Sequence, residues 1–184
     1  MNRAVFLDRD GVINEVVFRG SSKPIAPWSL EEFKFIPGIE KPLRELSQMG
    51  YLLFVVSNQP DIAKGRVKAV MVEKMNKKIM DSLPIREILI CPHDDSHHCL
   101  CRKPKPGMLL DLAHRWAVGL DRSYLIGDNW KDMEAGKAAG CRTILIDGSY
   151  NKDVKVTHRV KDIKVAVTTI QSIERQEYRT VQLN

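Results

Sequence analysis

Short apolar segments alternate with segments of helical periodicity along most of this chain. The apolar runs with the length of a buried strand occupy residues 4–7, 51–56, 85–90, 124–126 and 143–146. The segments whose apolar residues recur at helical spacing occupy residues 39–49, 67–83, 108–118 and 133–139. Strands and helices that alternate in this way predict βαβ units, and therefore an α/β fold with a parallel sheet covered by helices on both faces.

The alternation weakens from Tyr150 onward, where residues 160–173 are expected to add a strand edge and a last helix. A chain of 184 residues buries enough surface to fold without disulfides, so we expect a single domain over 1–184, with the role of the tail 150–184 left open. The longest apolar run, Tyr51–Val56, is far short of the about 20 residues that cross a bilayer. The apolar stretch after Arg3 also stops too early for a secretory signal, so a cytoplasmic protein without membrane partners is expected.

Polar side chains follow several of the predicted strands. Asp8 and Asp10 follow the first strand, Ser57 and Asn58 end the second, and Asp128 follows the fourth. Since the carboxyl ends of parallel strands meet at one edge of the sheet, these side chains should gather there. Taken alone, Asp-Arg-Asp-Gly is a polar turn, but three carboxylates in one pocket would repel each other without a hard cation, and Mg²⁺ binds carboxylates together with phosphate oxygens.

A basic segment, residues 101–107, lies between the third strand and the following helix. It carries Arg102, Lys103 and Lys105 and no acidic residue. A solvated loop stiffened by prolines is one interpretation. Its place at the rim favours an anion clamp at Arg102 and Lys103, because both side chains suit phosphate oxygens. For Lys105 the sequence does not decide.

Three of the four cysteines crowd into residues 91–101 beside histidines. Cys91 with His93, and Cys99 with Cys101, form two pairs at alternate spacing, and three thiolates with one imidazole make a closed tetrahedral zinc site. His97 and His98 are other candidates for the imidazole, and reduced cysteines without a metal are the alternative. The fourth cysteine, Cys141, is expected to pack as a small apolar side chain.

The ordered set of these motifs resembles the haloacid dehalogenase superfamily. The segments that carry the resemblance are Leu7–Val12, Val56–Gln59, Cys101–Pro104 and Gly127–Asp132, within residues 3–147. The cysteine segment resembles the zinc-bearing branch, which includes heptose bisphosphate phosphatases and histidinol phosphate phosphatases, and this favours His93 as the imidazole ligand. The resemblance implies a Rossmann-like α/β/α sandwich with little or no cap and magnesium-dependent hydrolysis of phosphate esters.

The resemblance also implies roles for individual residues. Asp8 resembles the nucleophile and Asp10 the general acid and base, while Asp8, the Asp10 carbonyl and Asp128 would hold Mg²⁺. The positions that would bind the phosphoryl group are Ser57 and Lys103. The positions that would contact the rest of the substrate are Arg102, Asn58, Gln59 and Asn129. Ser57, where the heptose enzymes have threonine, keeps the hydroxyl, whereas Pro60 and Asn129 depart from the commonest pattern.

Two substrates fit the resemblance. The segments 101–108 and 62–65 favour the 7-phosphate of D-glycero-D-manno-heptose 1,7-bisphosphate, whereas the short gap between His93 and Cys99 is closer to histidinol phosphatases. The net charge of +6 also suits a nucleic-acid module, but aromatic residues are only 7% of the chain and the zinc segment has none. A phosphorylatable receiver domain would need neither the zinc segment nor Asp10. We therefore expect a monomeric phosphatase of a small phosphorylated substrate that binds Mg²⁺ and Zn²⁺ and no nucleic acid.

Overall fold

The computed structural model describes residues 1–20 and 23–182. Its strands are β1 (Arg3–Leu7), β2 (Tyr51–Asn58), β3 (Glu87–Cys91), β4 (Tyr124–Gly127), β5 (Arg142–Ile146) and β6 (Arg159–Val160). Its α-helices are α1 (Glu40–Gln48), α2 (Pro60–Ala63), α3 (Ala69–Ser82), α4 (Gly107–Arg115), α5 (Trp130–Ala139) and α6 (Ile163–Gln182). Single turns of 3₁₀ helix lie at Asp95–His97 and Leu120–Arg122.

The strands form one parallel sheet in the order β3-β2-β1-β4-β5-β6. The chain moves outward from β1 through β2 to β3, then returns to the other side of β1 with β4. Leu7 therefore pairs with Val55 on one side and with Ile126 on the other. In open α/β sheets a crevice forms at the carboxyl ends where the strand order reverses, so the edge beside β1 and β4 is the expected place for a ligand.

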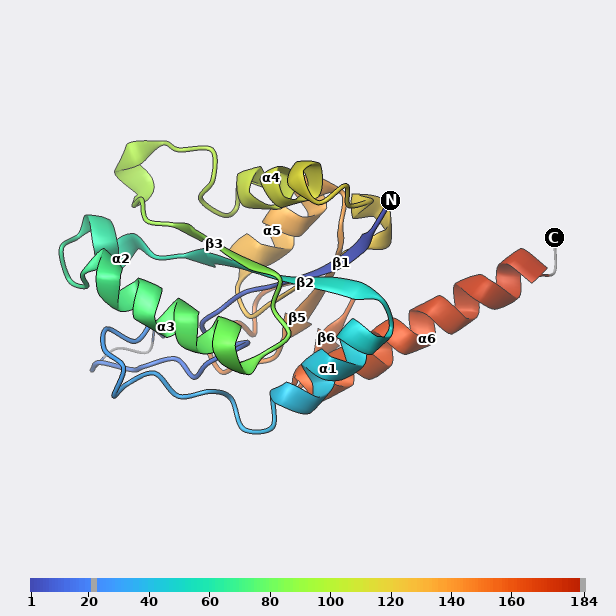
Figure 1. Ribbon diagram of the computed structural model, residues 1–184, viewed down its shortest axis with the longest axis horizontal. Helices are drawn as coiled ribbons and strands as arrows, with labels where there is room; N and C mark the ends of the chain where they lie inside the picture. The colour runs from blue at the N-terminus through green and yellow to red at the C-terminus, as the bar shows by residue number, and fades with distance from the viewer. Residues whose placement is uncertain (21–22, 183–184) are drawn as a thin grey trace.

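Helices cover both faces of the sheet, as the alternating pattern predicted (Figure 1). Val5 and Leu7 of β1 point into the core beneath α1, α3 and α6, whereas Ala4 and Phe6 point into the core beneath α4 and α5. Successive strand residues face opposite sides, and because both sides are covered, β1 is apolar from Ala4 to Leu7. The predicted Rossmann-like α/β/α architecture is confirmed.

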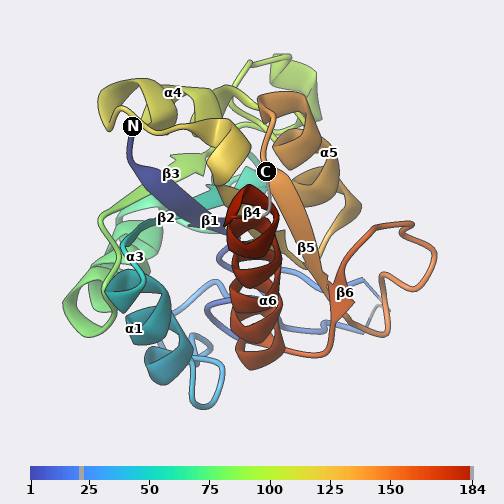
Figure 2. The ribbon, with the colours of Figure 1, turned by 90° about the vertical axis from the view of Figure 1, so that its right-hand side faces the viewer.

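Two helical segments differ from the sequence expectation. The single turn of α2 was not predicted, because four residues carry no periodic pattern; it begins at Pro60, which is favoured at a first helical position. Helix α6 continues beyond Ile173 to Gln182, and Figure 2 shows it between α1 and β5, with its C-terminal end toward the viewer. Its second half extends past the edge of the sheet (Figure 1). This part has no sheet to pack against, so it needs no apolar stripe.

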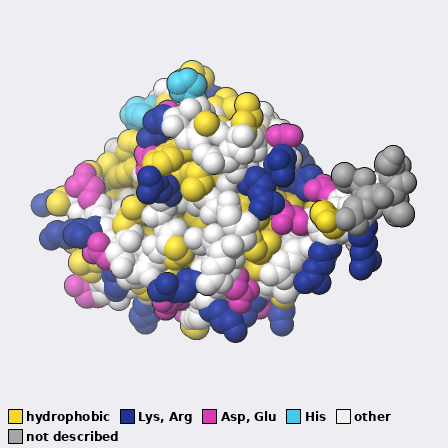
Figure 3. Space-filling model, turned by 45° about the vertical axis from the view of Figure 1, so that its right-hand side comes forward, with side chains coloured by type: hydrophobic (Ala, Val, Ile, Leu, Met, Phe, Trp, Pro, Cys, Tyr) yellow, Lys and Arg dark blue, Asp and Glu magenta, His cyan; other side chains and the backbone are white. Residues whose placement is uncertain are grey.

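Charged side chains of both signs share the surface. On the face shown in Figure 3, Lys and Arg side chains are interspersed with acidic and apolar ones. Among the helices of residues 1–20 and 23–182, none combines the length and the apolar character needed to span a bilayer.

Candidate active site

The predicted polar residues meet at the carboxyl edge of the central strands. Asp8 follows β1, Ser57 lies near the end of β2, and Asp128 follows β4. Asp8 and Asp128 are both almost fully buried. The backbone here is closely packed, since a Cβ on Gly11, whose φ is +91°, would lie 2.0 Å from Oδ2 of Asp128. Only glycine lets the chain after β1 pass this close to the second carboxylate.

Lys103 reaches this edge from the basic segment and is itself buried. Its ammonium group donates to Oδ1 of Asp8 at 2.8 Å and to the carbonyl of Val56 at 2.7 Å. It also forms an ion pair with Oδ1 of Asp132 at 2.5 Å. An ammonium group has three N–H donors, so these three contacts satisfy it. The side chain lies beside Asp8, where an incoming phosphate would meet a fixed positive charge.

Asp132 is a site residue that the sequence reasoning did not assign, although it is the last residue of the segment Gly127–Asp132, which carries part of the family resemblance. It lies in the first turn of α5, where its Oδ2 accepts from the backbone N–H of Asn129 at 3.0 Å. Asn129 in turn accepts from the N–H of Lys131 at 3.1 Å, so the two side chains cap the helix. The available signal was an acidic residue one helical turn after Asp128.

Burial changes the protonation of the clustered acids. Removal from water raises the pKa of Asp8 to about 7; the Lys103 charge opposes this shift, while Asp132 and Asp10 add to it. Burial, then the charges of Asp8 and Asp132, raise the pKa of Asp128 well above its ordinary value. Burial also disfavours the Lys103 ammonium, but Asp132 and Asp8 outweigh this effect and raise its pKa. The carboxylates of Asp8, Asp128 and Asp132 outnumber the single ammonium group of Lys103, so a further cation would stabilise their charged forms.

The acidic cluster fits a hard divalent cation. Carboxylate oxygens of Asp8, Asp128 and Asp132 all lie within 4.8 Å of one another. Mg²⁺ takes oxygen ligands in a compact octahedron and keeps open positions for water and phosphate. The carboxylate of Asp10 lies outside this cluster, and the resemblance implied the carbonyl of Asp10, not its side chain, as a metal ligand.

Asp10 instead lies in a network of donors. Its Oδ1 accepts from the Arg9 guanidinium at 3.0 Å and from Asn14 Nδ2 at 2.9 Å, and its Oδ2 accepts from Gln59 Nε2 at 2.7 Å. Gln59 also donates to the hydroxyl of Ser57 at 2.9 Å. Because the Arg9 side chain is fully buried, the network fixes the direction of the Asp10 carboxyl group.

The side chains at other positions predicted to contact the substrate form hydrogen bonds within the protein. The Asn58 amide makes two hydrogen bonds to the backbone of Lys103, at 2.9 and 3.1 Å, and so fixes the lysine that reaches Asp8. Arg102 donates to Asp95 at 2.8 Å and to the carbonyl of His93 at 3.2 Å. Lys105, undecided from the sequence, donates to the carbonyls of His98 and Cys99, away from the acids.

A cavity of about 530 Å³ opens over the acids. Of the predicted residues, Asp8, Asp10, Ser57, Asn58, Arg102, Lys103, Asp128 and Asn129 line it, whereas Gln59 lies buried behind its wall. Its outer walls carry further cations that sequence reasoning did not single out: Lys23, Lys64, Arg66 and Lys131. Tyr150 also lines it and donates its hydroxyl to Asp128. No sequence signal marked Tyr150 beyond its position after the fifth strand.

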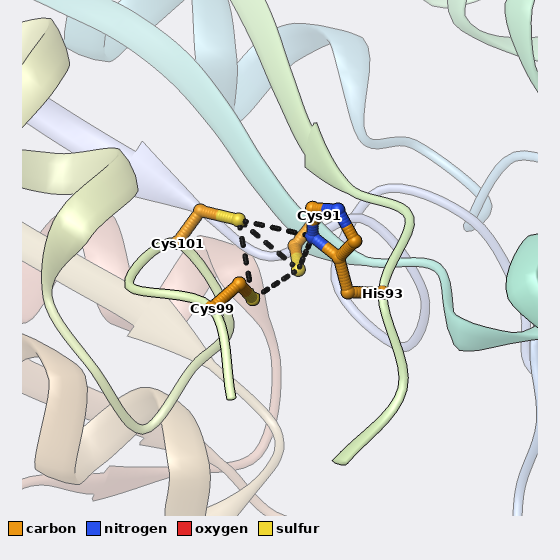
Figure 4. A group of neighbouring side chains, drawn as sticks. All are labelled: Cys91, His93, Cys99 and Cys101. Carbon is orange, nitrogen blue, oxygen red and sulfur yellow. Dashed lines mark hydrogen bonds between the residues drawn. The ribbon is translucent and has the colours of Figure 1, made fainter. Parts of the chain in front are cut away.

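Four side chains from the segment 91–101 converge beside this edge (Figure 4). The sulfur atoms of Cys91, Cys99 and Cys101 lie 3.3–3.5 Å apart, and Nδ1 of His93 lies 3.6 Å from Cys91 and 3.5 Å from Cys101. Tetrahedral zinc with bonds of about 2.3 Å to sulfur and about 2.0 Å to nitrogen has donor edges of about 3.8 and about 3.5 Å. The distances from sulfur to nitrogen match these values and those between sulfur atoms are somewhat shorter, so the four donor atoms are grouped as a tetrahedral zinc site requires.

The cysteine and histidine cluster is joined to the acidic edge through the sheet. Cys91 ends β3 and pairs in register with Asn58, and its carbonyl accepts from the N–H of Gln59 at 2.8 Å. The same loop then packs closely against the start of α4. A Cβ on Gly107 would lie only 2.3 Å from the carbonyl oxygen of Leu100. A metal at this cluster would fix the segment that leads into Arg102 and Lys103.

Comparison with known proteins finds several that are similar to this chain. A family model described as HAD-hydrolase-like matches residues 100–169. The chain is 36% identical over 157 residues to the D-glycero-beta-D-manno-heptose-1,7-bisphosphate 7-phosphatase of Rhodopseudomonas palustris, over 79% of this chain and 83% of that protein. It is 38% identical over 152 residues to the protein of the same name from Escherichia coli K12, over 76% of each chain. A relative from Campylobacter jejuni, named for the alpha anomer of the same compound, is 34% identical over 88% of this chain and 92% of its own.

A solved structure shares the fold. The D,D-heptose 1,7-bisphosphate phosphatase of B. bronchiseptica, complexed with magnesium and phosphate, superimposes with a TM-score of 0.79 at 25% identity. The match covers 92% of this chain and 98% of that one.

Proposed function

Because this chain belongs to the haloacid dehalogenase-like phosphatases, in the family of the D-glycero-D-manno-heptose 1,7-bisphosphate 7-phosphatases, we propose that it removes the 7-phosphate from that sugar. The chain is a phosphoric monoester hydrolase. The observation that carries the proposal is the buried Asp8, held by Lys103 beside Asp128 and Asp132 at the floor of a cavity with cationic walls.

The chemistry begins at Asp8. One of its oxygens attacks the phosphorus atom, the bond from phosphorus to the sugar oxygen breaks, and an aspartyl-phosphate forms. Asp10, held in place by Arg9, Asn14 and Gln59, gives a proton to the departing sugar oxygen. It then takes a proton from the water that attacks the aspartyl-phosphate, which releases phosphate and restores Asp8.

The phosphoryl group needs positive charge around its oxygens. Lys103 supplies a fixed ammonium beside Asp8, and the Ser57 hydroxyl lies at the same edge as a neutral donor. We propose that Asp8, Asp128 and Asp132, with the carbonyl of Asp10, hold Mg²⁺. When bound, this ion neutralises the charge that builds up on the transferring phosphoryl group.

The walls of the cavity support a sugar with two phosphate groups. Arg102 lies on one side, Lys64 and Arg66 after α2 lie on another, and Lys131 lies at the start of α5. In the structure Arg102 and Lys131 lie beside Asp95, and Arg66 lies beside Asp61. A second phosphate could bind these cations beside or in place of those carboxylates. The names of the relatives likewise favour heptose bisphosphate over histidinol phosphate.

We propose that the cluster of Cys91, His93, Cys99 and Cys101 holds a structural Zn²⁺. Four protein ligands leave no open position for a substrate, which is typical of a zinc ion that stabilises a loop. The free thiols suit a reducing compartment, so the proposal includes a cytoplasmic enzyme. A monomer is sufficient, because one chain supplies every residue named here.

A phosphate-release assay tests the substrate. The panel contains the alpha and beta anomers of heptose 1,7-bisphosphate, histidinol phosphate and hexose phosphates, ranked by kcat/KM, with Asp8→Asn as the inactive control. We expect heptose bisphosphate to rank first, with release of one phosphate only. A higher kcat/KM for histidinol phosphate would reject the substrate but keep the chemistry, whereas activity in Asp8→Asn would reject the mechanism.

A further inference from the structure

The loop after β5 turns back and contacts Asp128 at two points. The Tyr150 hydroxyl donates to Oδ2 of the Asp128 carboxylate. The next residue, Asn151, is buried, and its amide donates to the carbonyl of Asp128 at 2.7 Å and to the carbonyl of Ile146 at 2.8 Å. The main chain and the side chain of Asp128 are therefore both held by this loop, which lies outside the segments that carried the family resemblance.

Neighbouring atoms leave the Tyr150 side chain little freedom to move. A Cβ on Gly11 would lie 3.1 Å from the Tyr150 hydroxyl, and a Cβ on Gly148 would lie 3.1 Å from its ring. The ring also contacts Phe18, with 6.3 Å between the ring centres. The side-chain oxygen of Asn151 accepts a hydrogen bond from the backbone N–H of Gly148 at 3.0 Å, which closes the turn that carries Tyr150. These contacts restrict the positions that the hydroxyl can take.

The Asp128 carboxylate needs such a donor. It is buried beside Asp8 and Asp132, which repel it electrostatically, and it has more than one rotamer available. A donor on one oxygen opposes the rotation of the carboxylate away from the cluster. Partners that orient metal-binding carboxylates typically contribute 10–100-fold, roughly, to metal affinity.

We propose that Tyr150 is a positioning residue that orients the Asp128 carboxylate toward the divalent cation. The inference rests on the proposed function, because it takes Asp128 as a metal ligand. Tyr150 acts through Asp128 rather than on the phosphoryl group, so its loss should change metal binding more than the rate of the loaded enzyme.

The test is Tyr150→Phe, which removes the hydroxyl and keeps the ring against Phe18 and Gly148. Binding of Mn²⁺ to the metal-free acidic site, with zinc retained, is followed by the electron paramagnetic resonance signal of free Mn²⁺. We expect a dissociation constant raised about 10–100-fold, with kcat at saturating metal within about threefold of the parent. Tyr178→Phe, on the exposed end of α6, is the matched control and should bind Mn²⁺ like the parent.

Asp128→Asn separates the two proposals. If Asp128→Asn loses Mn²⁺ binding while Tyr150→Phe binds within about twofold of the parent, the role of Tyr150 is wrong and the metal site stands. If Asp128→Asn binds Mn²⁺ normally, the metal site of the proposed function is itself wrong. Phe18→Ala, which removes the ring contact but not the hydroxyl, should leave the affinity within about threefold, and a larger loss would assign the effect to ring packing.

Discussion

A change of pH from 8 to 5.5 should weaken Mg²⁺ binding, because the cation and protons compete for the same buried acids. Burial raises the pKa of Asp8 to about 7, against the opposing charge of Lys103. The pKa of Asp128 is raised as well, chiefly by burial and then by Asp8. A metal ligand must be deprotonated before it binds, so the metal affinity follows the ionised fraction.

The size of the effect follows from the Asp8 value. With a pKa of about 7, roughly nine tenths of Asp8 is ionised at pH 8 and roughly 3% at pH 5.5. The apparent dissociation constant for Mg²⁺ should therefore rise about 30-fold between these pH values if Asp8 alone titrates, and more if Asp128 titrates in the same range.

The metal-free protein should change stability in the opposite direction. The Asp8 pKa is higher in the folded protein than its ordinary value of 3.8, so the folded state binds more protons between about pH 4 and pH 7. Stability of the metal-free protein should then fall as the pH rises through this window. The raised pKa of Lys103 contributes stability that is constant here, because that group titrates well above this range. The Mg²⁺-induced increase in Tm should accordingly grow from pH 5.5 to pH 8.

Isothermal titration calorimetry with Mg²⁺ measures the affinity at pH 5.5, 6.2, 7 and 8. Melting curves with and without Mg²⁺ measure the stability. The protein is depleted of Mg²⁺ by dialysis rather than by a strong chelator, and zinc content is checked at each pH so that loss of the cysteine-bound metal is not mistaken for the effect. An Mg²⁺ affinity that is constant from pH 8 to pH 5.5 would refute the assignment of Asp8 as a buried, proton-competing ligand.

Four further changes probe separate parts of the site. Asp10→Asn should slow turnover at least about 10²-fold with Mg²⁺ affinity little changed, since it removes the acid and base but not a ligand side chain, and steady-state kinetics with calorimetry check this. Asp132→Asn keeps an oxygen for the helix cap but removes a charge beside Lys103, so Mg²⁺ affinity should fall roughly 10-fold or more by calorimetry; an unchanged affinity would remove it from the metal site. Cys99→Ser should lower both the zinc content and the Tm, measured by elemental analysis and melting, and a full zinc content would exclude Cys99 as a ligand. Gly107→Ala places a Cβ 2.3 Å from the Leu100 carbonyl oxygen, so denaturant unfolding should show a loss of about 1–3 kcal/mol, and parental stability would show that the loop can move away.

Much of the candidate site could be predicted from the sequence, because several of its residues directly follow or end predicted strands. The apolar run that forms β1 predicts a buried strand, and the polar residue after such a strand must emerge at the sheet edge, as Asp8 does. The same reasoning brought Ser57 and Asp128 to that edge from other strands. Close spacing along the chain similarly predicted the cluster of Cys91 and Cys101 with their neighbours, because residues so near in sequence can converge without help from the rest of the fold.

Residues whose roles depend on where side chains point were not readable in this way. Asp132 lies on a helix where an acidic residue in the first turn is explained by capping alone, and only the folded chain brings Lys103 to it. Asn58 and Gln59 appeared as substrate contacts, yet their amides are bound to the Lys103 backbone and to Asp10. Which partner an amide binds depends on distances of a few tenths of an ångström between separate segments.

For this protein, the sequence by itself determined the parallel α/β architecture, the edge of the sheet at which the polar side chains gather and their residue types, because hydrophobic periodicity and strand polarity are local properties of the chain. The tertiary structure decided that the magnesium-type cluster includes Asp132, that the Asp10 side chain turns to Arg9, and that Tyr150 returns to Asp128. Those contacts join segments that lie far apart or turn unpredictably, and their geometry is set by the packing of the whole sheet and its helices.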